Sequence, residues 1–158
     1  MKKILISISF IFNLLYADNI DVNKILIEAK NSNKNLLIFV HSPNCSYCRR
    51  MISQNFKSKT ILSHIEKNFI AVFIDIYDNG KVTFNNFKGS KKEFADHIGS
   101  VAVPATTFVD KDGKIIYNFI GYRNIDEYLI ELKYISSKSY KEISIESYRE
   151  KIEFESDD

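Results

Sequence analysis

Hydrophobic runs alternate with amphipathic stretches along most of the chain. Two continuous apolar runs, Leu36 to Val40 and Phe69 to Ile76, are typical of strands that are buried on both faces. Two further runs, Thr106 to Val109 and Ile115 to Ile120, flank the turn Lys111-Asp112-Gly113, and this pattern predicts a β-hairpin. The chain therefore contains four segments that can form one sheet.

Stretches with apolar residues at helical spacing lie between and around these strands. Asp21 is a suitable N-cap for the first of them. Ser90 and Glu93 have the spacing of a capping box, and Gly99 is suited to end the helix that they begin. Six helices are predicted. One begins at Asp21, four cover about residues 45–56, 60–67, 90–98 and 124–135, and the last begins after Ser144.

Helices that alternate with strands indicate an α/β fold. The chain has 158 residues, of which 45% are hydrophobic and 27% are charged, and this is enough for one domain with a sizeable core. Residues 77–89 are polar and aromatic, with a turn signal at Asn79-Gly80 and a short strand expected at Val82 to Phe84. No repeat and no linker divides the chain, so we expect a single domain over residues 18–158.

Residues 1–17 have the three-part pattern of a secretory signal peptide. Lys2 and Lys3 form a positive start, Ile4 to Leu15 is largely apolar, and Ala17 is a small residue before the polar sequence begins. Export would place the cysteines where disulfides can form. The alternatives are a buried N-terminal helix and an uncleaved anchor, although about twelve apolar residues are short for a bilayer span. We expect cleavage, a periplasmic protein and no stable membrane insertion.

The charge of the chain argues against a partner that is a polyanion. The formal net charge is only +2, and Lys2 and Lys3 account for it, so the chain without residues 1–17 is formally neutral. Arg49-Arg50 and a group of lysines fit a solvated surface better than a nucleic-acid site. The lysines of this group are Lys88, Lys91 and Lys92. We therefore expect no nucleic-acid partner.

The two cysteines of the chain lie in the motif Cys45-Ser46-Tyr47-Cys48. The motif follows a buried strand and a turn, and it begins a helix, where free N–H groups and the helix dipole favour a thiolate on Cys45. Cys48 lies three residues later on the same helical face, within reach of the Cys45 sulfur. This arrangement indicates thiol–disulfide exchange.

Two other interpretations of the cysteine pair are open. A structural disulfide at this spacing would close too small a loop to constrain much of the chain. A zinc site would need further ligands, but the chain has no third cysteine, and its histidines lie in separate segments. These histidines are His41, His64 and His97. We assign no metal to the protein and no role to the histidines.

These residues resemble the thioredoxin superfamily, in particular the exported thioredoxin-like reductases of the SoxW type. The resemblance covers about residues 33–135 and, more loosely, the C-terminal helix, so that residues 136–158 form a helical extension. Besides the cysteine motif, it rests on Val103-Pro104 before a strand, Asp112-Gly113-Lys114 at the hairpin and Gly121-Tyr122 after the last strand. It implies a thioredoxin fold, with a central mixed β-sheet flanked by helices on both faces.

The resemblance also implies roles for residues around the cysteines. Pro104 should be cis and face the two sulfurs, while the backbone of Val103 pairs with a client strand; the alternative is a trans proline that begins a strand. Tyr47 and Pro43 would line the rim of the site, unless they serve only packing. No organic cofactor is implied, and the chain has no Gly-rich dinucleotide loop.

Three departures from the family pattern affect these expectations. The common Trp-Cys-Gly-Pro-Cys is replaced here by Asn44 and the motif that follows it, and Ala105 stands after Pro104, where Thr is usual. Phe39 stands six residues before Cys45, where the family has a buried acid that assists the second thiol. This chain therefore lacks the acid that would assist proton transfer at Cys48.

The expected activity is the reduction of disulfides in client proteins by a Cys45–Cys48 dithiol, with electrons from a membrane thiol donor. An oxidase would use the same chemistry, but its relatives carry a large helical insertion, for which residues 77–89 are too short and too polar. An isomerase is a second alternative, but its relatives dimerise through an N-terminal domain that residues 18–32 cannot supply. A binding module without redox activity is the third. We expect a monomer.

Overall fold

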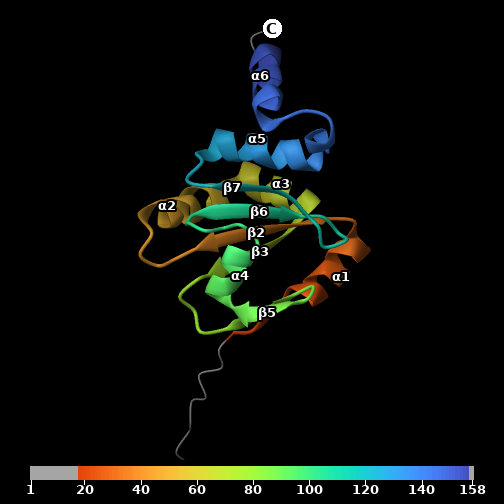
Figure 1. The fold of residues 1–158 in the computed structure, drawn as a ribbon. Helices are drawn as coiled ribbons and strands as arrows, with labels where there is room; N and C mark the ends of the chain where they lie inside the picture. Colours follow the sequence, from red (N-terminus) through yellow and green to blue (C-terminus); the bar gives the residue numbers. More distant parts are fainter. Residues whose placement is uncertain (1–17, 157–158) are drawn as a thin grey trace, which may run out of the picture.

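The computed structural model describes residues 18–156 (Figure 1). The predicted signal peptide, residues 1–17, lies outside the described residues. The strands are β1 (Ile20–Asp21), β2 (Asn35–His41), β3 (Phe69–Asp75), β4 (Lys81–Phe84), β5 (Phe87–Ser90), β6 (Ala105–Val109) and β7 (Ile115–Ile120). The helices are α1 (Val22–Ser32), α2 (Ser46–Gln54), α3 (Lys59–Asn68), α4 (Lys91–His97), α5 (Ile125–Ser136) and α6 (Ile145–Ser156), with 3-10 turns η1 (Asn55–Lys57) and η2 (Ser139–Lys141). Each predicted helix and strand has a counterpart among these elements.

The central sheet has the strand order β3-β2-β6-β7. β2 and β3 run parallel, whereas β2 and β6, and β6 and β7, run antiparallel, which confirms the predicted mixed sheet and hairpin. Leu36 to Val40 of the inner strand β2 are fully buried. Their continuous hydrophobic run reflects a strand that is covered on both sides.

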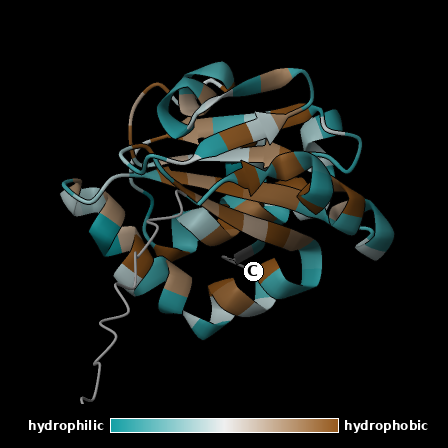
Figure 2. Cartoon of the chain, turned by 90° about the horizontal axis from the view of Figure 1, so that it is seen from below, coloured by the Kyte–Doolittle hydropathy of each residue, from teal (hydrophilic) through white to brown (hydrophobic). Residues whose placement is uncertain are grey.

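Different kinds of side chain cover the two faces of the central sheet. Figure 1 shows α3 and α5 on one face and α1 and α4 on the other. We call the first the aromatic face, because its buried strand residues include Phe39, Phe69, Phe108 and Phe119. We call the second the aliphatic face, because its buried strand residues include Leu36, Ile38, Val40 and Val109. The strands between the two layers are mostly hydrophobic (Figure 2).

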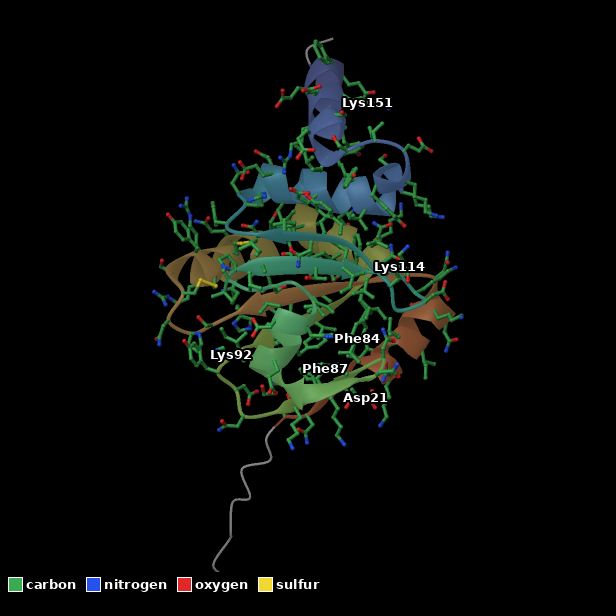
Figure 3. The ribbon with its side chains drawn as sticks, in the orientation of Figure 1. Asp21, Phe84, Phe87, Lys92, Lys114 and Lys151 are labelled. Carbon is green, nitrogen blue, oxygen red and sulfur yellow. A yellow bond between two sulfur atoms is a disulfide. The ribbon has the colours of Figure 1, made fainter. Side chains whose placement is uncertain are left out.

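A second, three-stranded sheet, β1-β4-β5, lies beyond the aliphatic face. The sequence predicted only one strand here, and the turn of the hairpin is at Asn85-Asn86 rather than at Asn79-Gly80. Phe84 and Phe87, labelled in Figure 3, both pack against Phe94 of α4, with ring centroids 5.7 Å apart in each pair. β5 has little hydrophobic pattern of its own, so its strand conformation depends on pairing with β4 and on this packing.

The helix ends follow the predicted caps. The Asn23 N–H donates to Asp21 Oδ1 at 3.1 Å, and α1 begins there. Ser90 and Glu93 form a complete capping box at α4. Gly99, which follows α4, has a φ of 79°, a left-handed conformation that glycine adopts without strain.

The C-terminal extension packs on the same core as the rest of the chain. α6 stands on α5 at one end of the molecule (Figure 1), and its residues Ile145 and Tyr148 are buried against the aromatic cluster. Glu131 of α5 is fully buried and forms ion pairs with Arg149 of α6 and with Arg123, whose Nε lies 3.4 Å from Glu131 Oε1. These contacts make the extension an integral part of the folded structure.

Candidate active site

Cys45 and Cys48 are joined by a disulfide at the beginning of α2, visible as the yellow bond in Figure 3. Their Cα atoms lie 5.2 Å apart. Cys45 is the N-cap residue of α2 and is partly exposed, whereas Cys48 is fully buried. The structure therefore brings the predicted pair together, with Cys45 partly exposed and Cys48 covered.

The turn that precedes the motif sets the position of Cys45. The Cys45 N–H donates to the Ser42 carbonyl at 3.3 Å, and Arg49 Nη1 donates to the Pro43 carbonyl at 2.7 Å. The Cys48 N–H donates to Cys45 Sγ at 3.0 Å. A thiolate on Cys45 would keep this bond and would face the positive end of the α2 dipole, and both stabilise negative charge.

The peptide bond between Val103 and Pro104 is cis, as expected. Ala105 pairs with Val40 near the end of β2, so Pro104 lies at the same edge of the sheet as the turn that leads to the cysteines. The Gly121 N–H donates to the Pro104 carbonyl at 2.7 Å. The backbone N–H and C=O of Val103 make no hydrogen bond to another described residue. These two groups are thus available to an extended chain from outside.

A polar cluster that the sequence did not predict holds the loop before Pro104. Asn118 Nδ2 donates to Thr107 Oγ1 at 2.7 Å, to Ser100 Oγ at 3.3 Å and to the Ile98 carbonyl at 3.3 Å. Ser100 Oγ and Thr107 Oγ1 are 3.1 Å apart, and both residues are buried. No local pattern announces such a cluster, because its members come from a loop and two different strands.

Tyr47 lies on the exposed surface of α2, as expected of a rim residue, with 56% of its surface accessible. Its ring is 5.6 Å from that of Tyr122, which follows Gly121 and thus lies next to the Pro104 carbonyl. Arg50 stacks over the Tyr122 ring with its guanidinium carbon 4.9 Å from the centroid. In the sequence Tyr122 contributes only to the resemblance, and its contact between α2 and the loop after β7 could not be predicted from it. The Gly121-Tyr122 pair after the last strand was the available signal.

Aromatic rings take the place of the acid that the family has before the cysteines. Phe39 is fully buried, and its ring centroid lies 4.8 Å from that of Phe56 and 5.5 Å from that of Phe73. His41, the last residue of β2, stacks on Phe39, and their ring centroids are 5.8 Å apart. Burial lowers the pKa of His41, and the nearby Asp75 carboxylate opposes this shift. The layer under α2 is therefore apolar, with one imidazole at its border.

The described residues contain no group of three or more His, Cys, Asp or Glu side chains suited to hold a metal ion. His64 is 3.0 Å from Ser136 Oγ, and His97 stacks on Phe87 at 4.7 Å. None of the helices within residues 18–156 has the length and hydrophobicity that a bilayer crossing requires.

Comparison with known proteins agrees with this arrangement. The family model of the thioredoxin-like domain matches residues 22–136, which include both cysteines and the cis proline. This chain belongs to the thioredoxin-like family. The match begins earlier than the resemblance that the sequence indicated and includes α1, which packs on the aliphatic face through the fully buried Val22 and Ala29. The thioredoxin fold, with helices on both faces of a mixed sheet, is thereby confirmed.

Solved structures share the thioredoxin fold at low sequence identity. A thioredoxin-fold protein from Helicobacter pylori is 26% identical, with a TM-score of 0.62 over 76% of this chain and 80% of that one. A thioredoxin from Thermus thermophilus is 19% identical, with a TM-score of 0.59 over 73% of this chain and 84% of that one. The oxidoreductase DsbH is 17% identical, with a TM-score of 0.55 over 74% and 84%. No curated protein matches the chain.

Proposed function

We propose that this thioredoxin-like protein is an exported thiol–disulfide oxidoreductase of the SoxW type that reduces disulfides in client proteins. The observation that carries the proposal is the Cys45–Cys48 disulfide at the beginning of α2, with Cys45 partly exposed and Cys48 buried. A nucleophile must reach the client, whereas a resolving thiol must reach only the nucleophile.

The reaction consists of two thiol–disulfide exchanges. The Cys45 thiolate attacks one sulfur of the client disulfide and forms a mixed disulfide, and the other client sulfur leaves as a thiolate, which takes up a proton. The Cys48 thiolate then attacks Cys45 Sγ and releases the second client sulfur. The client gains two electrons, and the Cys45–Cys48 pair is left oxidised. A membrane thiol donor returns two electrons by the same exchange in reverse.

Residues around the disulfide would bind the client. The unpaired backbone groups of Val103 can add a client strand to this edge, beside the cis Pro104. Tyr47 covers the neighbouring surface and can contact client side chains. In this scheme no organic cofactor and no metal takes part.

Export and the oligomeric state are further parts of the proposal. The pattern of residues 1–17 supports a cleaved signal peptide and a periplasmic protein that is not inserted in the membrane. We propose that this protein is a monomer. The mass of the protein recovered from a periplasmic extract tests the cleavage, which should leave a chain that begins at Asp18. Recovery of the full-length chain in the membrane fraction would contradict it.

Two cysteine variants test the reaction. With a protein disulfide as substrate, Cys45→Ser should lower turnover to background, because the nucleophile is gone. Cys48→Ser should accumulate a mixed disulfide with the client, visible as a larger species on a non-reducing gel. Normal turnover by Cys48→Ser would reject the two-cysteine scheme.

The reduction potential of the pair tests the direction of electron flow. Equilibration with glutathione buffers should give a value near that of thioredoxin, about −270 mV, if the protein is a reductase. A value near about −120 mV would instead assign the protein to the disulfide-forming oxidases.

A further inference from the structure

Two arginines lie one helical turn beyond the cysteine motif. Arg49 follows Cys45 by four residues and Arg50 follows Tyr47 by three, so each lies on the same side of α2 as the residue one turn before it. Both side chains are exposed. Within residues 18–156 neither arginine forms an ion pair with a carboxylate. The site thus has two accessible positive charges beside the disulfide.

Both guanidinium groups are held in place by neutral partners. Arg49 donates to the Pro43 carbonyl at 2.7 Å. Arg50 lies over the Tyr122 ring and donates through Nε to Gln54 Oε1 at 3.2 Å. A guanidinium has five N–H donors, and most of them bind no described residue here. Because the groups are already oriented, binding a carboxylate would cost little side-chain entropy.

The segment that carries the cysteine motif and α2 has only positive charges. Residues 41–65 contain no Asp or Glu, whereas Lys57 of η1 and Lys59 of α3 add positive charge beyond the end of α2. At the same edge of the sheet, Asp75 ends β3, and Asp78 is paired with Lys91. The carboxylates near the site are therefore Asp75 and Asp78 on the side of β3 and Asp126 and Glu127 in the first turn of α5, whereas α2 itself carries only positive charge.

We infer that Arg49, Arg50, Tyr47 and Tyr122 form a surface that selects client segments with Asp or Glu within a few residues of the reacting cysteine. This inference rests on the proposed function and names its substrate class. A carboxylate can accept paired hydrogen bonds from a guanidinium, and opposite charge speeds the encounter of the two proteins. An exposed pair contributes modestly, so two pairs correspond to a preference of roughly tenfold at low salt.

Two peptide probes with the same disulfide test the inference. Each probe is a synthetic peptide dimer joined by one disulfide, and the cysteine is flanked by glutamates in one probe and by lysines in the other. Dithiothreitol serves as the reductant, and its direct reaction with each probe is subtracted. The readout is the ratio of kcat/KM for the acidic probe to kcat/KM for the basic probe. A ratio within one protein cancels any change in the reactivity of the thiols.

The variants Arg49→Gln/Arg50→Gln and Lys57→Gln/Lys59→Gln remove the same charge, the first from α2 beside the disulfide and the second from η1 and α3 beyond the end of α2. We expect a ratio near ten for the wild type at low salt, a smaller ratio at 1 M salt, a ratio near one for the arginine variant and the wild-type ratio for the lysine variant. A wild-type ratio near one, or an equal loss in both variants, would overturn the inference. If neither probe is reduced above background, the proposed reductase function fails, and the inference fails with it.

Discussion

The aromatic and the aliphatic faces of the central sheet hold the two halves of the site in different ways. On the aromatic face, α2 contributes Met51 to the cluster that contains Phe39, and both side chains are fully buried. On the aliphatic face, the loop before Pro104 is held by hydrogen bonds among Ser100, Thr107 and Asn118. The cysteines therefore rest on apolar packing, whereas the loop before Pro104 rests on directional polar contacts.

This difference matters because the two halves have different tasks. Burial of apolar side chains excludes water and stabilises α2 in proportion to the buried area, but this effect is not directional. A hydrogen-bond cluster contributes less free energy but determines where a loop lies to within a fraction of an ångström. The backbone of Val103 needs such a position if it is to pair with a client strand.

The largest effect is expected from Phe39→Ala on the aromatic face. The loss of a buried ring should lower the free energy of unfolding by about 3–5 kcal/mol, because a cavity remains beside Phe56 and Phe73. Urea denaturation measures this loss. Ile38→Val, the neighbouring position on the aliphatic face, is the control and should cost about 0.5–1.5 kcal/mol. Equal losses of unfolding free energy in the two variants would show that the ring of Phe39 contributes no more to stability than the aliphatic packing at Ile38.

Asn118→Leu should separate the two halves of the site. It removes the donor to Thr107, Ser100 and the Ile98 carbonyl, which should cost about 1–3 kcal/mol. We expect the KM for a protein disulfide to rise more than the KM for hydroxyethyl disulfide, because only the protein needs the loop. The double variant Asn118→Leu/Thr107→Val should recover part of the stability. An equal change in both KM values would contradict a positioning role.

The helix caps offer a matched pair across the sheet. Ser90→Ala at α4 and Asn124→Ala at α5 each remove a complete capping box and should each cost about 1 kcal/mol in the free energy of unfolding. Hydrogen exchange should increase first in the helix that has lost its cap. A loss well above this value at Ser90 alone would show that the aliphatic layer depends more on its helix ends.

The smallest effect concerns His64 on the aromatic face. Burial lowers its pKa below the ordinary 6.5, although a hydrogen bond from the imidazole to the Leu132 backbone opposes the shift. Below pH 6.5 the unfolded chain binds more protons at this residue than the folded one, so its contribution is full above pH 6.5 and is lost as pH falls through the folded pKa. His64→Gln should therefore lose less stability than the wild type between pH 7.5 and 5.5. Parallel stability curves would reject this account.

Several parts of the site could be predicted from local sequence. The Cys45-x-x-Cys48 spacing, the hydrophobic run before it and the Val103-Pro104 dipeptide are short-range signals, and the structure places all of them at one edge of the sheet. Asp21 and the Ser90–Glu93 pair are predictable for the same reason, because a cap involves residues only a few positions apart. β5 was not predicted, since its strand conformation depends on pairing with β4 and on packing against Phe94 of α4.

The sequence by itself determined the order of elements, the buried strands, the helix caps and the pairing of the two cysteines. These depend on hydrophobic periodicity and on contacts within one or two turns of the chain. Only the tertiary structure decided that Tyr122 meets Tyr47 and Arg50, that Asn118 holds the loop at Ser100, and that Glu131 joins α6 to the core. Those contacts join residues far apart in the chain, and side-chain burial and hydrogen-bond geometry become defined only after the sheet has brought them together.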